Sequence, residues 1–193
     1  LSLPKELRRN SEGALRACYT PLLEKLRLKE IPLPEKLELI PNSFAWHTYG
    51  GKWMKTADGF RVTTTEWDYQ IATQTIEAPS LELRAAVTVD AVGGGLYISD
   101  GTKRYVLSVE PDKNRLLVAA PHDFTYVMAR QYPFRRHQTY DLRVIVMDGN
   151  IEIYVQDELL VQGGLEIGTV TQWGIFCDRG TTIAENISLF ELE

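Results

Sequence analysis

Acidic side chains are the first candidates for chemistry, because three of the 26 in the sequence lie close together: Glu152, Asp157 and Glu158. A glycosidase needs two carboxyl groups that face each other across the substrate, roughly 5 to 10 Å apart. Glu152 alternates with Ile151 and Ile153 in a strand-like stretch, which predicts that its side chain points to solvent. Asp157 and Glu158 fall in the turn that follows. The cluster therefore predicts a charged outer face and no active site.

The histidines and cysteines offer little for a metal or a nucleophile. The three histidines share no metal-ligand spacing with each other or with a cysteine: His47, His122 and His137. Cys177 lies in an apolar strand pattern, an environment that disfavours a reactive thiolate. We expect Cys177 and Cys18 to be free thiols, since two cysteines make no disulfide framework. No metal site is expected.

Glycine-rich cofactor motifs are also missing from the sequence. There is no phosphate-binding Gly-x-x-x-x-Gly-Lys loop and no Gly-x-Ser-x-Gly nucleophile elbow. Residues 93–95 are three glycines, but they lack the strand-to-helix context of a dinucleotide site and predict a turn or bulge before the strand at 96–98. We expect no cofactor.

Aromatic residues concentrate between positions 44 and 69. Exposed rings can stack on sugars, whereas large aromatic side chains often fill a core, and the sequence leaves both interpretations open. The candidates for carbohydrate binding are Trp46, Tyr49, Trp53, Trp67 and Tyr69.

Strands must position these residues, because the hydrophobic pattern has a period of two after residue 43. Stretches rich in β-branched and aromatic residues occur at 84–89, 104–109, 142–146 and 151–155. Asp-Gly pairs, which favour tight antiparallel turns, follow at positions 58–59, 100–101 and 148–149. Longer turns are predicted at 112–114 and 178–180. We expect roughly a dozen strands in two stacked antiparallel sheets, with almost no helix.

The first 43 residues differ from the rest. They hold five of the nine prolines and one short segment, 21–27, that could form a helical turn. We therefore divide the chain into a mostly irregular lead-in segment, residues 1–43, packed on a β-sandwich domain, residues 44–193.

Charge and hydropathy exclude two classes of partner. The formal net charge is −5, and the one compact basic group, around Arg135 and Arg136, is too short to attract a polyanion. No apolar run approaches the ~20 residues that span a bilayer. We expect no nucleic acid and no membrane partner.

Three stretches together resemble the C-terminal region of family 32 glycoside hydrolases, the invertase, inulinase, levanase and sucrose-6-phosphate hydrolase group. Residues 1–7, LSLPKEL, with the turn at 12–13 and the segment 21–27, PLLEKLR, are similar to that family's link between catalytic propeller and sandwich. Residues 95–118 resemble its central hairpins. Residues 142–155, 173–176 and 187–192 resemble its last strands, although these also resemble other concanavalin A-like sandwiches.

The resemblance implies a concanavalin A-like sandwich of the jelly-roll type without catalytic residues. The family carries its nucleophile, transition-state stabiliser and acid/base in Trp-x-Asn-Asp-Pro, Arg-Asp-Pro and Glu-Cys motifs on a five-bladed propeller, and none of these strings occurs here. Two departures, Ala119-Ala120 for Asp-Arg and Gly149-Asn150 for Ser-Ser, indicate a divergent member.

The resemblance also implies the partners. We expect an accessory domain that stabilises the N-terminal propeller of a β-fructosidase-type parent, with a carbohydrate or a second copy of the chain as further candidate partners. The alternative is a lectin-like carbohydrate-binding module, stand-alone or appended to another protein. The compartment stays open, and a bacterial cytoplasm is our working expectation.

Overall fold

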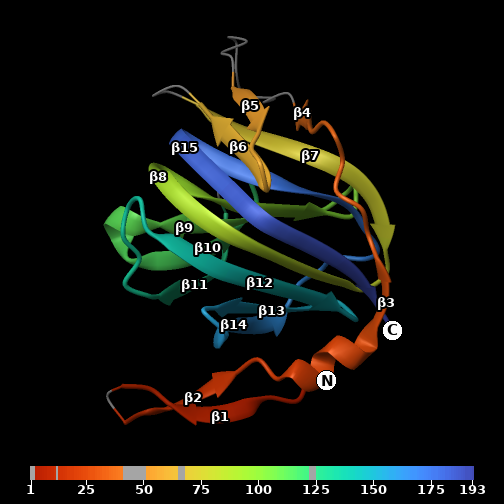
Figure 1. Ribbon diagram of the computed structural model, residues 1–193, viewed down its shortest axis with the longest axis vertical. Coiled ribbons are helices and arrows are strands. Elements are labelled where there is room, and N and C mark those ends of the chain that lie inside the picture. The colour runs from red at the N-terminus through yellow and green to blue at the C-terminus, as the bar shows by residue number, and fades with distance from the viewer. Residues whose placement is uncertain (1–2, 12, 41–50, 65–67, 122–124) are drawn as a thin grey trace.

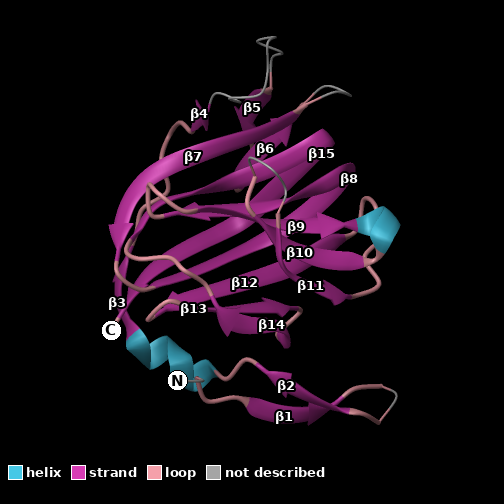
Figure 2. Cartoon of the chain, turned by 180° about the vertical axis from the view of Figure 1, so that it is seen from behind, coloured by secondary structure: helices cyan, strands magenta, loops and turns pink. Residues whose placement is uncertain are grey.

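The computed structural model describes residues 3–11, 13–40, 51–64, 68–121 and 125–193. The described chain is almost entirely antiparallel β-structure (Figures 1 and 2). The lead-in holds β1 (Glu6–Arg9), β2 (Leu15–Cys18), the 3₁₀ helix η1 (Pro21–Leu26), β3 (Arg27–Glu30) and β4 (Glu38–Ile40). The remainder holds β5 (Lys52–Lys55), β6 (Gly59–Thr63), β7 (Tyr69–Ala78), β8 (Leu81–Ser99), β9 (Arg104–Glu110), the 3₁₀ helix η2 (Pro111–Lys113), β10 (Arg115–Ala119), β11 (Tyr126–Gln131), β12 (Thr139–Met147), β13 (Asn150–Val155), β14 (Glu158–Gly164) and β15 (Val170–Leu192).

Two long strands, β8 and β15, organise the molecule. They pair with each other along most of their length, and their two halves have different outer neighbours. The first half of β8 pairs with β12 and the second half with β9, while β15 pairs first with β7, then with β6 and finally with β3. The pairings join all the strands into one sheet that folds over into two layers, as an all-β sandwich requires.

The first layer runs β14-β13-β12-β8-β15-β6-β5, and the second runs β11-β10-β9-β8-β15-β7-β4. Alternate residues of both layers face inward, as in β8, where Leu96 and Ile98 are fully buried in the main core with Trp173 of β15. The fold class predicted from the sequence is confirmed, and so are the four strands expected from its pattern.

The three Asp-Gly turns are confirmed as connections between neighbouring antiparallel strands. Asp148 and Gly149 both have positive φ, 50° and 68°, which the tight β12–β13 hairpin requires. Residues 111–113 form η2, and Asn114 follows in the left-handed conformation with φ 48°. This helix is three residues long, so the sandwich has almost no helix, as predicted.

Two predictions are wrong, the turn at 178–180 and the turn or bulge at 93–95. Residues 178–180 lie inside β15, where Arg179 and Gly180 take positive φ values of 52° and 147° and the strand continues beyond them. The glycines at 93–95 lie inside β8, where side chains would collide with neighbouring groups: a Cβ on Gly95 would lie 2.1 Å from the Leu107 carbonyl oxygen. In both places glycine allows close strand packing within a continuing strand, and sequence pattern alone does not separate this role from a turn.

The lead-in has more regular structure than the sequence predicts. β1 and β2 form a hairpin at the edge of the first layer, where Cys18 pairs with Glu158 of β14 (Figure 1). β3 and β4 add to the sheet beside β15 and β7. The boundary expected at residue 43 lies outside the described residues. Neither helical segment that the structure describes is long and apolar enough to cross a membrane.

Candidate functional site

Glu152 is buried, which overturns the prediction of a solvated side chain. Its exposed fraction is 3%, and it accepts hydrogen bonds from Lys5 Nζ at 2.7 Å and from the Tyr154 hydroxyl at 2.6 Å. Burial, and then the bond to Glu152, raise the pKa of Tyr154. Glu152 does point to the opposite face of β13 from Ile151 and Ile153, as predicted, but the lead-in covers that outer face. Glu152 therefore holds the lead-in in place.

A second buried ion group joins the lead-in to the same face. Glu82 of β8, 1% exposed, accepts two hydrogen bonds from Arg27 of β3, at 2.7 and 2.9 Å, and one from Arg143 of β12 at 2.5 Å. Burial alone would raise the pKa of Glu82, but the hydrogen bonds and charges of Arg27 and Arg143 outweigh it and lower that pKa. Glu82 is therefore a carboxylate held by two guanidinium groups.

Aromatic and apolar side chains enclose these charges. The Arg143 guanidinium lies 3.5 Å from the centre of the Tyr19 ring, and that of Arg27 lies 4.2 Å from the centre of the Phe190 ring. A small cluster of buried residues surrounds them: Tyr19, Leu23, Ile145, Tyr154 and Leu192. Charge pairing and apolar packing together fix the lead-in on the first layer.

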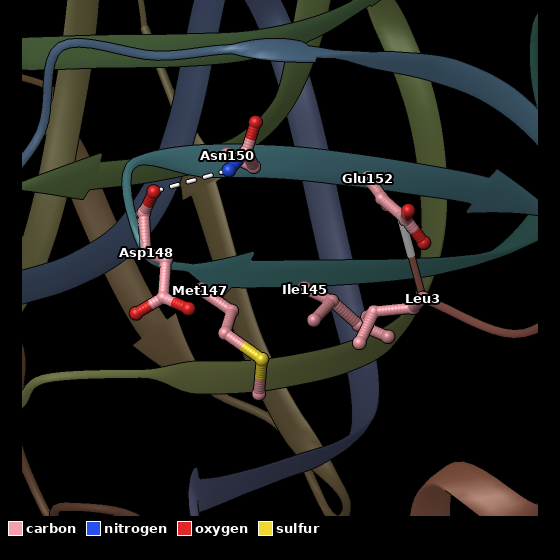
Figure 3. A pocket seen from close by; sticks show the side chains of 6 residues that line it. All are labelled: Leu3, Ile145, Met147, Asp148, Asn150 and Glu152. Carbon is pink, nitrogen blue, oxygen red and sulfur yellow. Dashed lines mark hydrogen bonds between the residues drawn. The ribbon is translucent and has the colours of Figure 1, made fainter. Parts of the chain in front are cut away.

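A small pocket opens beside the Glu152 contact, between the lead-in and the β12–β13 hairpin (Figure 3). Its volume is about 40 Å³, and its lining residues are Leu3, Ile145, Met147, Asp148, Asn150 and Glu152. Such a volume holds a few water molecules at most, since one water needs ~10–15 Å³. The pocket is too small for a sugar ring.

The structure does not bring the described aromatic candidates together. Trp53 of β5 packs edge-on against Phe60, with ring centres 6.0 Å apart, beside the main core. Tyr69, at the start of β7, packs against Phe176 in a separate cluster on the other side of the second layer. Trp46, Tyr49 and Trp67 lie outside the described residues. Sugar binding by these rings stays a prediction.

Among the described residues, the cysteines are buried thiols and no metal-binding group is formed. Cys18 and Cys177 are both buried and free, as predicted, and burial raises the pKa of Cys177 to about 12. Within the part of the chain that the structure describes, no three histidine, cysteine or acidic side chains are grouped so that they could hold a metal ion. His47 and His122 lie outside that part.

Large exposed apolar side chains are concentrated in the lead-in. Six of the nine in the described chain belong to it: Leu7, Leu15, Leu22, Leu28, Leu33 and Leu39. Leu7 and Leu15, 70% and 60% exposed, lie on the same face of the β1–β2 hairpin. These leucines leave apolar surface exposed on a segment that ion pairs hold to the sandwich.

A polar groove of about 410 Å³ lies on the outer face of the first layer. Its lining comes from β8, β12, β15 and the β13–β14 turn: Arg84, Ala86, Thr139, Asp141, Gln156, Asn186 and Ser188. Sequence reasoning missed this set completely. These residues form no motif, because strand pairing assembles them from positions up to about a hundred residues apart.

No protein-family model and no curated protein sequence matches the chain. Among solved structures, the carbohydrate binding module CBM66 from Bacillus subtilis is similar, with a TM-score of 0.66 and 14% identity over 74% of this chain and 92% of that one. A fructosyltransferase from A. japonicus matches with a TM-score of 0.54 and 15% identity, over 74% of this chain and 27% of the enzyme.

A third similar structure is the exoplasmic/lumenal domain of VIP36 in a Ca²⁺/Man-bound form, with a TM-score of 0.51, 14% identity and coverage of 75% of this chain and 82% of that one. At these identities the likeness shows the fold alone. The chain has the β-sandwich fold found in carbohydrate-binding modules and in domains of carbohydrate-active enzymes.

Proposed function

We propose that this chain is the non-catalytic accessory sandwich of a family 32 glycoside hydrolase, whose parent enzyme acts on sucrose or fructans. One observation carries the proposal. Buried ion pairs hold the lead-in on the sandwich, while most of its leucines remain exposed to solvent. The resemblance of the sequence to that family's C-terminal region, and the match of the fold to about a quarter of a fructosyltransferase, support it.

The buried charges explain why the lead-in would be built in this way. A linker that only tethers two domains has no need of enclosed ion pairs, which require desolvation of every charge involved. A segment that must present apolar side chains to a neighbouring domain in one fixed orientation does need them. The occupant that we assign to the Leu7 and Leu15 face is the catalytic propeller of the same polypeptide, as the family resemblance implies.

The coding sequence that precedes Leu1 tests this assignment directly. We expect it to encode a propeller with Trp-x-Asn-Asp-Pro, Arg-Asp-Pro and Glu-Cys motifs. A start codon immediately before Leu1, or an upstream domain of another class, would contradict the proposal.

A variant of the complete enzyme tests the docking face itself. We expect Leu7→Asp with Leu15→Asp to lower the unfolding temperature of the propeller and to expose the hairpin to protease. Thr63→Asp, at an exposed position of β6, is the matched control and should change neither. If the chain is an appended lectin-like module instead, the leucine variants would leave the propeller's stability unchanged.

A further inference from the structure

The polar groove on the first layer is a binding site that bracing a neighbouring domain does not require. We propose that it binds a neutral oligosaccharide. This inference goes beyond the accessory role and does not depend on it, because the groove lies in the sandwich itself and is lined by no residue of the lead-in.

Hydrogen-bonding groups without partners line the groove. The side-chain amides of Gln156 and Asn186 and the hydroxyl of Ser188 have no hydrogen bond to any residue that the structure describes. Amides supply donors and acceptors together, and a hydroxyl supplies both in one atom. Sugar hydroxyls have the same double character, so this set is complementary to a polyol.

The charges in the groove cancel each other. Arg84 binds Asp141 through Nε, at 3.0 and 3.1 Å, and through Nη2 at 2.5 Å. This pairing raises the pKa of Arg84 and leaves its Nη1 as a spare donor among the described contacts. Because the guanidinium is already neutralised, the groove favours an uncharged ligand over a phosphate or a carboxylate.

Both amide residues that line the groove have positive φ. Gln156 forms the two-residue β13–β14 turn with Asp157, and both have positive φ, 52° and 64°. Such turns strongly prefer Asn-Gly, and a glutamine in this conformation is unfavourable. Asn186 also has positive φ, 51°, at an irregularity in β15, where its N–H donates to the Asp58 carbonyl at 2.9 Å. Both residues line the groove, and the conformational cost is larger for Gln156, because asparagine adopts positive φ more readily than other non-glycine residues.

The size of the groove fits a short oligosaccharide. Its volume of about 410 Å³ is within the range of small-molecule sites, and its lining includes the small side chain of Ala86. No lining residue is aromatic, so stacking does not contribute. We therefore expect millimolar affinity.

NMR titration of the isolated chain tests the proposal, with fructo-, malto-, manno- and galacto-oligosaccharides as probes. We expect at least one of them to shift the side-chain amide resonances of Gln156 and Asn186 with a common, saturable dissociation constant. Gln156→Gly and Asn186→Gly should each weaken that binding about fivefold, the effect of one lost hydrogen bond. Glycine adopts positive φ without strain, so neither variant should lower the unfolding temperature.

Gln131→Ala, which removes an exposed amide on β11 in the second layer, is the control and should leave binding unchanged. The proposal is overturned if no neutral oligosaccharide shifts these resonances at millimolar concentration. It is overturned equally if shifts occur only near Trp53 and Tyr69, or if a sulfated oligosaccharide binds and the neutral ones do not. Because the isolated chain is used, none of these outcomes depends on whether a propeller precedes it.

Discussion

Glu82 shows how a single buried charge can connect distant parts of the chain. It lies between guanidinium groups from β3 and β12, 55 and 61 residues away in sequence. Its position on β8, with Leu81 and Leu83 on either side, has the alternating pattern that normally indicates a solvated outer face. The structure buries it because the lead-in covers that face, and no local pattern signals such coverage.

Removal of the Glu82 carboxylate is expected to destabilise the protein strongly. Glu82→Ala would remove the buried carboxylate that Arg27 and Arg143 share and leave them only their longer contacts, each 3.5 Å, with the more exposed Glu24 and Asp157. Loss of one partner from a buried ion group costs about 3–5 kcal/mol. The free energy of unfolding from urea denaturation measures this loss. Glu30→Ala, on the exposed face of β3, is the control and should change stability by less than about 0.5 kcal/mol. A loss of that smaller size for Glu82→Ala would show that the carboxylate does not hold the lead-in.

The same carboxylate should make stability depend on pH. Because the folded protein lowers the pKa of Glu82, its contribution is fully present above the unfolded value of about 4.3 and is lost as pH falls through the lower folded value. We expect the free energy of unfolding to fall with pH below about 4, and to fall less steeply in Glu82→Gln. Equal slopes for the two proteins between pH 5 and pH 2 would contradict this assignment.

The thiols of Cys18 and Cys177 should react with an alkylating reagent at different rates, because they differ in burial. Cys177 has no exposed surface and a pKa raised to about 12 by burial, so almost none of it is thiolate at neutral pH. We expect an alkylating reagent at pH 8 to label Cys177 only after denaturation, whereas Cys18, 7% exposed at the lead-in edge, should react through local opening. Mass spectrometry of digested protein gives both rates. Fast labelling of Cys177 in the folded protein would contradict the packing of β15.

Among the structural elements, the three connections at Asp-Gly pairs were predicted most reliably from the sequence. Each Asp-Gly pair lies between neighbouring antiparallel strands, and Gly101 and Gly149 have the positive φ that this residue type adopts locally. Gly59 has no positive φ, and β15 excludes a side chain there, because a Cβ would lie 2.0 Å from the Ala184 carbonyl oxygen. The glycines inside β8 and β15 do not form the turn or bulge and the turn that the sequence predicted, because a neighbouring strand leaves no room for a side chain at these positions. Gly95 is an example, because only the pairing with β9 places the Leu107 carbonyl against it.

The β12–β13 turn gives a direct test of this local argument. Gly149 has φ +68°, and a Cβ there would meet the Leu165 oxygen at an ordinary 3.5 Å, so the cost of Gly149→Ala is conformational. We expect a loss of about 1 kcal/mol in the free energy of unfolding. Gly164→Ala, at a position without positive φ and with nothing within 4 Å of the added carbon, should be neutral or slightly stabilising. Equal effects of the two substitutions would show that φ does not decide the cost.

For the whole molecule, the sequence predicted the two sheet layers, but it did not predict the polar groove or the exposed apolar face of the lead-in. Alternating residues report which side of a strand is buried, and this was enough for an all-β sandwich. The groove residues come from four separate stretches, and the exposed lead-in leucines acquire meaning only once Arg27, Lys5 and their partners are seen to fix the segment in place. Such sites depend on how distant strands pair, which alternation does not encode.

The exposed leucines predict how the isolated chain behaves in solution. Leu7 and Leu15 share one face of the hairpin and Leu22 is 60% exposed on η1, so separation from a covering domain leaves apolar surface in water. We expect weak, concentration-dependent dimers through the lead-in, seen as a rising sedimentation coefficient at micromolar concentrations. Leu26 is half-buried in the cluster around Tyr19, so a substitution there would change folding as well as association. Leu7→Asp and Leu22→Asp are therefore the better test. These variants should restore a monomer, while Thr63→Asp should still dimerise. A strict monomer at every concentration would mean that this surface is not apolar enough to need a partner, which would weaken the docking role assigned to it.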